Sequence, residues 1–310
     1  YTSNGEIYNN GTGKINTTGD NSIGIYAVNG TKVDTAAGTE INIGKNGVGI
    51  FAEGYKQGTA QAFGNGELEI KNSGLIKSGA GTNAIGIYLN NNSGAAIGNS
   101  ILNLSNGTVD VSASEGGVGV YVNMGTVTDS GSTITAGKNG VALYAKDSSV
   151  TLAGSTINLL GDNALGLYLD GTTSFNGTGN ININGQNIVL FNMNSSGSIS
   201  NNFNVANVAP GSTYTLGNIT GGAFEYTGIS NLATNGTLVS GTNSAIYLNG
   251  SVITSAAGAT NVAAAVLNGQ YTGTVPAGMT AGTDGENNGT ITLGDSSVGL
   301  FGKNGSRVSN

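Results

Sequence analysis

The side chains of this chain that could do chemistry are few, because the sequence contains neither histidine nor cysteine. Without them the usual nucleophile–base triads and most metal centres cannot be built. A carbohydrate-active β-helix enzyme would need acids clustered with lysine or arginine on one face. Here the turn acids Asp20, Asp162 and Asp295 are far apart in the sequence, and Arg307 is the single arginine. We therefore expect no catalytic residue and no enzymatic activity.

One acidic segment, Asp284-Gly285-Glu286-Asn287-Asn288, has oxygen ligands of the kind that calcium prefers. It lacks the repeated glycine-aspartate nonapeptide of calcium-binding β-rolls. We therefore expect no metal site and no cofactor.

Aromatic residues recur in copies of one short pattern. Residues 117–122 read GVGVYV, and residues 140–145 read GVALYA. The steps from Tyr121 to Tyr144, then to Tyr168 and then to Phe191 are 23, 24 and 23 residues. Copies of the pattern have their aromatic residue at Tyr26, Phe51, Tyr88, Tyr121, Tyr144, Tyr168, Phe191, Tyr247 and Phe301. Such regular self-similarity indicates a repeat protein.

A second short strand is expected about ten residues before several of these aromatics, beginning at Ile41, Ile134, Ile181 and Ile291. The rest of each period has room for a third strand and two turns. This organisation is typical of one coil of a parallel β-solenoid. We predict an all-β fold, a single-stranded right-handed parallel β-helix of roughly eleven or twelve coils. Residues 1–310 would form one segment cut from a longer array.

Within the repeated strand, aliphatic residues stand three before, one before and one after the aromatic, and glycine often stands two before it. Alternate residues of a strand point to opposite faces, so we expect the aliphatic set inside and the glycine and aromatic rings outside. Rings on consecutive coils would then stack, about 4.8 Å apart. The alternative is that the rings cap the core or lie under a loop. The predicted ligand-binding stripe consists of Tyr88, Tyr121, Tyr144, Tyr168 and Phe191.

Asparagine often stands five residues before the aromatic, where the chain must turn sharply. It tolerates the left-handed backbone conformation that such a corner requires. Stacked corner amides can also hydrogen-bond from coil to coil as a ladder, and the alternative is that each asparagine is only a turn former. The predicted corner residues are Asn21, Asn46, Asn83, Asn139 and Asn163.

Insertions interrupt the repeat at about 53–67, 90–106 and 270–288. The first contains Tyr55 and Phe63, and loops on a rigid scaffold often place binding residues. These two aromatics are therefore further candidate ligand-binding residues, and the alternative is a tolerated surface loop.

The net charge of −7, with only ten basic residues, argues against nucleic acid or an anionic membrane surface as a partner. No apolar run is long enough to span a bilayer as a helix. The regular aliphatic pattern argues against disorder despite 55 glycines.

Residues 45–52 (KNGVGIFA), 117–122 and 138–145 (KNGVALYA) resemble repeats of the large autotransporter adhesins of the fusobacterial type. The resemblance is clearest at 13–191 and 288–305. It implies a β-helical passenger exported by type V secretion and displayed outside the cell. Membrane anchoring is implied only through a C-terminal β-barrel outside this segment.

We therefore expect an extracellular adhesin or adhesin stalk that binds a protein or glycan on partner bacteria or host cells. A carbohydrate-active β-helix enzyme and a purely structural spacer are the rival interpretations. A tight group of acids with lysine or arginine would favour the first, and featureless faces would favour the second.

Overall fold

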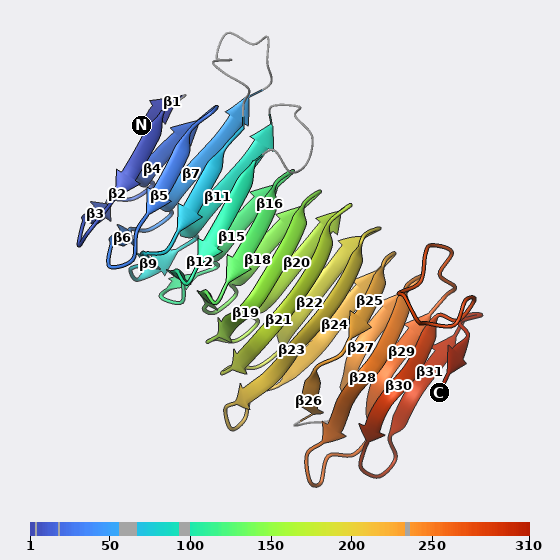
Figure 1. Ribbon diagram of the computed structural model, residues 1–310. Coiled ribbons are helices and arrows are strands. Elements are labelled where there is room, and N and C mark those ends of the chain that lie inside the picture. Colours follow the sequence, from blue (N-terminus) through green and yellow to red (C-terminus); the bar gives the residue numbers. More distant parts are fainter. Residues whose placement is uncertain (4, 18, 56–66, 93–99, 233–235) are drawn as a thin grey trace.

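The computed structural model describes residues 1–3, 5–17, 19–55, 67–92, 100–232 and 236–310. These residues form 32 strands and no helix. The strands stack as successive coils along one axis, with the two termini at opposite ends (Figure 1). Because the described residues contain no helix, none of them could cross a membrane in that form.

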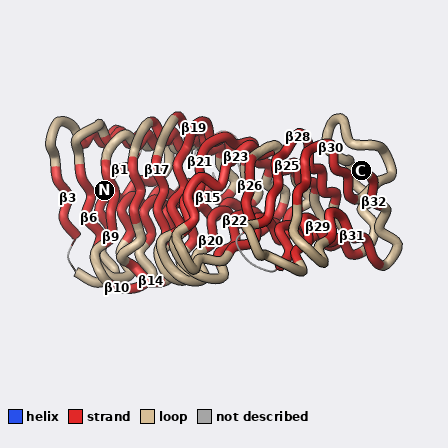
Figure 2. The backbone as a smooth tube through the Cα atoms, turned by 90° about the horizontal axis from the view of Figure 1, so that it is seen from below, coloured by secondary structure: helices blue, strands red, loops and turns tan. Residues whose placement is uncertain are grey.

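One regular coil shows how the chain winds. β18 (Val141–Lys146) lies in the first sheet, and β19 (Ser149–Leu159) then crosses the second. β19 is kinked at Gly154, whose φ of 67° belongs to the left-handed region. β20 (Leu165–Gly171) returns to the first sheet, directly beside β18. Figure 2 shows such coils side by side along the long axis, with loops gathered along the rims.

In other coils two short strands take the place of the long one, so a coil has three strand segments. An example is β5 (Lys32–Thr35) followed by β6 (Glu40–Ile43). This agrees with the three strands per period that the spacing predicts.

The first sheet has 12 strands, which corresponds to a solenoid of about eleven turns. Its neighbouring strands pair in parallel, as the repeat predicts. In order they are β1 (Thr2–Ser3), β4 (Ile23–Val28), β7 (Val48–Tyr55), β11 (Ile85–Asn92), β15 (Val118–Asn123), β18, β20, β22 (Ile188–Ser195), β24 (Tyr214–Thr220), β27 (Gly236–Thr242), β29 (Val262–Asn268) and β31 (Val298–Lys303).

The second sheet has 18 strands, and a small third sheet pairs β10 (Gly81–Thr82) with β14 (Ser114–Glu115). The strands of the second sheet are β2 (Glu6–Asn9), β3 (Lys14–Thr17), β5, β6, β8 (Glu69–Asn72), β9 (Leu75–Ser78), β12 (Ile101–Ser105), β13 (Thr108–Asp110), β16 (Thr126–Ser130), β17 (Thr133–Ala136), β19, β21 (Ser174–Ile183), β23 (Ser198–Val208), β25 (Ala223–Tyr226), β26 (Ile229–Leu232), β28 (Ala245–Ser255), β30 (Gly285–Thr292) and β32 (Val308–Ser309).

The core is a continuous column of aliphatic side chains between the first and second sheets. In one coil Val120 and Val122 of the first sheet are fully buried, as are Val127 and Ile134 of the second. Each such side chain contributes about 1.5–3 kcal/mol by leaving water. Stacked coils therefore hold the fold together without disulfides.

The irregular steps of the repeat keep the pairing register. Phe51 pairs with Tyr88, and Tyr88 pairs with Tyr121, although these steps are longer than one period. The additional residues of these two steps fall largely outside the described residues, so the first two insertions stay a prediction. The third insertion, predicted at about 270–288, is a connection over residues 269–284. Its predicted end is wrong, because β30 begins at Gly285 and pairs with β28.

Tyr247 does not belong to the aromatic repeat, and its assignment as a copy is wrong. Its strand, β28, lies in the second sheet, where Tyr247 pairs with Glu225 and Glu286. The segment 244–248 has the same alternation as a true copy, and that alternation suits either sheet equally well. The pairing of this segment with β25 and β30 therefore determines that it lies in the second sheet.

Candidate functional site

Aromatic rings stack along the outer face of the first sheet, and we call this stack the aromatic ladder. Consecutive ring centroids are 4.8 to 5.3 Å apart, and their planes lie within 24° of parallel. The spacing follows the distance of about 4.8 Å between paired strands. Each stacked pair contributes about 0.5–1.5 kcal/mol beyond burial. The ladder consists of Tyr1, Tyr26, Phe51, Tyr88, Tyr121, Tyr144 and Tyr168.

The rings of the ladder are partly exposed, and the residues beside them point inward. Val120, Leu143 and Leu167, one position before their rings, are fully buried. The expected outward orientation therefore holds for the four tyrosines from Tyr88 to Tyr168. Their role in binding a partner stays a prediction.

The glycine two positions before the ring points inward, so the expectation that it shares the face of the ring is wrong. A Cβ on Gly119 would lie 2.8 Å from Cγ2 of Ile134 and 2.5 Å from the carbonyl oxygen of Ala142. Gly119 and Val120 are both buried, whereas Val118 is partly exposed. The strand therefore departs from strict alternation here, because glycine lets the second sheet approach closely.

Two further columns flank the ladder on the same outer face, and together the three columns form what we call the ladder face. On one side lie partly exposed aliphatic residues, three positions before the rings. They include Ile85, Val118, Val141 and Leu165. On the other side lie polar residues, two positions after the rings. They are Glu53, Asn90, Asn123, Lys146 and Asp170.

Hydrogen bonds join the polar column from coil to coil. The Asn123 amide donates to Oδ1 of Asn90 at 2.8 Å, and the Asn90 amide donates to Oε1 of Glu53 at 3.2 Å. The Tyr144 hydroxyl donates to Asp170 at 3.5 Å, which links this column to the ladder. Sequence reasoning missed these residues. The signal was available, since a strand residue two positions from an outward ring faces outward too.

Phe191 does not join the ladder, and its inclusion in the binding stripe is wrong. Phe191 pairs with Leu167, and Tyr168 pairs instead with Asn192. Phe191 is 0% exposed, with ring centroids 5.8 Å from both Phe175 and Phe224 in edge-to-face contacts. A shift of one residue in register moves a side chain to the opposite face.

A sequence signal for this shift exists in the corner asparagine. Asn187 adopts the left-handed corner conformation, with φ of 56°, and it stands four residues before Phe191. The other corner asparagines stand five residues before their rings. Counting from the corner therefore identifies Asn192, and not the nearest aromatic, as the outward position.

The two aromatics predicted in the first insertion cannot be placed. Phe63 and the side chain of Tyr55 lie outside the described residues. The backbone of Tyr55 ends β7. The proposal that these two residues bind a ligand therefore stays a prediction.

The predicted corner asparagines all have a positive φ. The values are 60° for Asn21, 52° for Asn46, 53° for Asn83, 55° for Asn139 and 58° for Asn163. Each therefore has the turn-forming conformation that the sequence predicts.

The amide ladder along these corners is interrupted, so the continuous form that we considered is wrong. The Asn83 amide donates to Asn46 at 3.4 Å, and the Asn163 amide donates to Asn139 at 3.0 Å. Between these two runs Gly116 takes the corner, with φ of 69°, and glycine has no side-chain amide. Asn139 donates instead to Glu115 at 2.8 Å.

Burial within the ladder face raises the pKa of Tyr144 to about 12, and the nearby Asp170 carboxylate adds to this effect. Burial also raises the pKa values of Tyr88 and Tyr121. The unfolded phenol ionises near 10. The stabilisation from neutral, stacked tyrosines is thus complete below about pH 10 and is lost as the pH rises towards about 12.

We predict that an alkaline titration will show some tyrosines ionising late, together with loss of the fold. The measurement is phenolate absorbance alongside circular dichroism. Tyr144→Phe keeps the ring and should remove part of the late phase. A single ionisation step near pH 10 in a protein that stays folded would contradict the prediction.

Among the described residues, no three acidic side chains come together in a group that could hold a metal ion. Asp284 is buried and accepts backbone N–H bonds from Tyr271 at 2.6 Å and from Arg307 at 2.7 Å. Glu286 accepts the Thr280 N–H at 2.7 Å. Both carboxylates of the segment considered for calcium thus already accept hydrogen bonds from backbone N–H groups.

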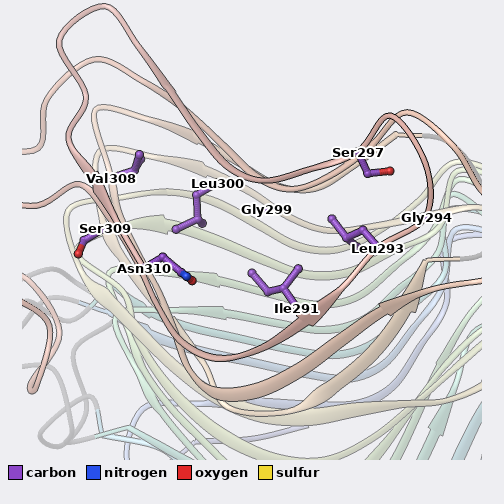
Figure 3. Close-up of a pocket in the computed structure, with 9 residues that line it drawn as sticks. All are labelled: Ile291, Leu293, Gly294, Ser297, Gly299, Leu300, Val308, Ser309 and Asn310. Carbon is purple, nitrogen blue, oxygen red and sulfur yellow. The ribbon is translucent and has the colours of Figure 1, made fainter.

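A cavity of about 410 Å³ opens inside the last coil (Figure 3). Ile291, Leu293, Leu300 and Val308 provide its apolar lining. The first three pack against the hydrophobic core. The cavity is therefore the end of the core column, and the architecture explains it without a ligand.

No family model matches the chain, and no curated protein matches its sequence. A crystal structure of a TibC-catalysed, hyper-glycosylated TibA55-350 fragment is similar over 99% of this chain and 98% of that chain, with 14% identity and a TM-score of 0.27. A likeness at this level carries no argument about the chain. Its function must be inferred from its own residues.

Proposed function

We propose that this chain is part of a surface-displayed autotransporter passenger that acts in cell adhesion. The ladder face would bind a protein or a glycan on partner bacteria or host cells. The observation that carries the proposal is the ladder itself, a stack of partly exposed aromatic rings over seven coils.

The chemistry of the ladder face suits recognition. Tyrosine offers a large contact area with little side-chain entropy to lose, and its hydroxyl group can form a directional hydrogen bond with the partner. The aliphatic column widens the apolar surface, and contiguous apolar surface on a soluble protein commonly marks an interaction site. The column from Glu53 to Asp170 adds donors and acceptors along one edge of that surface.

The rigidity of the scaffold also supports the proposal. Each ring from Tyr26 to Tyr144 lies between the rings above and below it, and its neighbours along the strand are buried in the core. A surface ordered before binding loses little conformational entropy when the partner arrives.

The test is an adherence assay with partner cells. Replacing Tyr121, Tyr144 and Tyr168 together by alanine should lower adherence at least about tenfold, because buried tyrosines are common hot spots of interfaces. Thr151→Ala, an exposed change on the second sheet, is the matched control and should leave adherence unchanged. Treating the cells beforehand with protease or with periodate distinguishes a protein receptor from a glycan.

Two outcomes would favour the rival interpretations. If the tyrosine variant adheres normally but melts at a lower temperature, the ladder only stabilises a spacer. If the protein turns over members of a glycan panel and replacing one aspartate abolishes that turnover, it is an enzyme.

A further inference from the structure

A second surface feature lies on the opposite sheet, where the connection 269–284 folds over β25 and β28. This connection stands out beside the C-terminal coils (Figure 1). Between it and the outer face of the second sheet is a cavity of about 520 Å³, which we call the groove. Cavities of about 300–1,000 Å³ are typical of small-ligand sites. Its main lining residues are Ser198, Ser200, Ala223, Glu225, Tyr271 and Val275.

The connection 269–284 forms one wall of the groove, and it is held to the second sheet and to the last coil. The buried Asp284 carboxylate accepts the Tyr271 N–H at the start of the wall and the Arg307 N–H of the last coil. Further along, Met279 packs with Tyr247, Ala223 and Ala245 in a small apolar cluster. The groove is therefore ordered before any ligand arrives.

The floor of the groove presents the carboxylate of Glu225, which one hydroxyl group and one amide group hold in place. Glu225 Oε2 accepts the Ser200 hydroxyl at 2.9 Å, and Oε1 accepts the Asn249 amide at 2.8 Å. Each carboxylate oxygen has about two acceptor sites, so both can accept a further hydrogen bond. Ser198, one coil below Ala223 and exposed, adds a hydroxyl that both donates and accepts.

The opposite wall is apolar and aromatic. Val275 and Pro276 line it, and Tyr271 stands at its start. A hydroxyl-and-carboxylate floor beside an apolar wall matches a sugar ring, whose hydroxyl edge is polar and whose C–H face is apolar. Among the described residues that line the groove, Glu225 is the one charged side chain, so an anionic ligand is disfavoured.

We propose that the groove is a binding site for a neutral saccharide, with Glu225 accepting hydrogen bonds from sugar hydroxyls and Tyr271 contacting the ring face. The site lies on the second sheet, away from the ladder face. It does not depend on the adhesion proposal.

The experiment measures binding of lactose and N-acetyllactosamine to the whole chain by saturation-transfer NMR and calorimetry. Both should bind, and the anionic sialyllactose should bind more weakly. Glu225→Gln should weaken binding about tenfold, because a hydrogen bond to a charged group is replaced by a neutral one. Tyr271→Ala should weaken it by a similar factor.

Two further variants serve as controls, and Ser200→Ala is a third test of the groove. Asp295→Asn removes an exposed charge away from the groove and should leave the affinity unchanged. Ser200→Ala is a small change in the floor of the groove and should weaken sugar binding. It tests the site even if Tyr271→Ala disturbs the fold of the wall. The triple tyrosine variant of the ladder face should bind both sugars normally, which separates this proposal from adhesion.

The proposal is overturned if neither neutral sugar binds at millimolar concentration, or if sialyllactose binds as tightly as lactose. It is also overturned if Glu225→Gln, Tyr271→Ala and Ser200→Ala all bind with the affinity of the unchanged protein.

Discussion

Phe191→Ala should destabilise the protein by about 3–5 kcal/mol, the cost of removing a fully buried phenylalanine from a packed core. Phe191 is 0% exposed and packs edge to face against Phe175, Phe203 and Phe224. The small side chain would leave a cavity that these three rings cannot fill without moving. Urea unfolding followed by circular dichroism measures the loss.

The matched comparison is Tyr144→Ala, which removes a partly exposed ring of the ladder. It loses two stacking contacts, worth about 0.5–1.5 kcal/mol each, and leaves no internal cavity. Asn192→Ala, at the outward position beside Tyr168, should have a smaller effect still. Equal losses for Phe191→Ala and Tyr144→Ala would mean that Phe191 belongs to the surface stripe.

Gly86→Val should destabilise the protein by about 3 kcal/mol or more, because overpacking a tight core forces the backbone to shift. A Cβ at this position would lie 2.3 Å from Cγ1 of Val109 and 2.5 Å from the carbonyl oxygen of Gly119. The carbonyl oxygen belongs to the paired strand of the next coil and cannot retreat freely. Ala142 shows that one coil accommodates a methyl group at the equivalent position, so the test uses valine.

Ile85→Ala is the control for this variant, since Ile85 is partly exposed beside the inward glycine. Ile85→Ala should lower the free energy of unfolding by less than about 1 kcal/mol, as surface changes usually do. Strict alternation along the strand predicts the opposite order, with Ile85 in the core and Gly86 outside. Thermal unfolding of the two variants decides between the two arrangements.

Much of the architecture could be predicted, because a solenoid repeats its local physics in every coil. The period, the parallel pairing and the left-handed corners at residues such as Asn46 and Asn139 follow from patterns within one repeat. The outward tyrosines follow from alternation around well-packed neighbours such as Val120 and Leu143. The polar column was equally predictable, but only from positions counted two residues beyond each ring.

The groove could not have been predicted in this way. It joins Glu225 to Tyr271, which are far apart in the sequence, and it exists because the connection 269–284 folds back over the second sheet. The apolar cluster of Met279 with Tyr247 holds that connection in place. Nothing in the local pattern of either segment specifies this contact.

The repeat, the all-β class and the left-handed corners follow from local sequence patterns, since these features depend on neighbours within a few residues. Contacts between coils, by contrast, place Phe191 in the core, turn Gly119 inward and bring Tyr247 into the second sheet. The physical reason is register: a strand's facing depends on how it pairs with the coils above and below, and a slip of one residue reverses it. Those pairings join residues more than twenty positions apart, as Leu167 and Phe191 show.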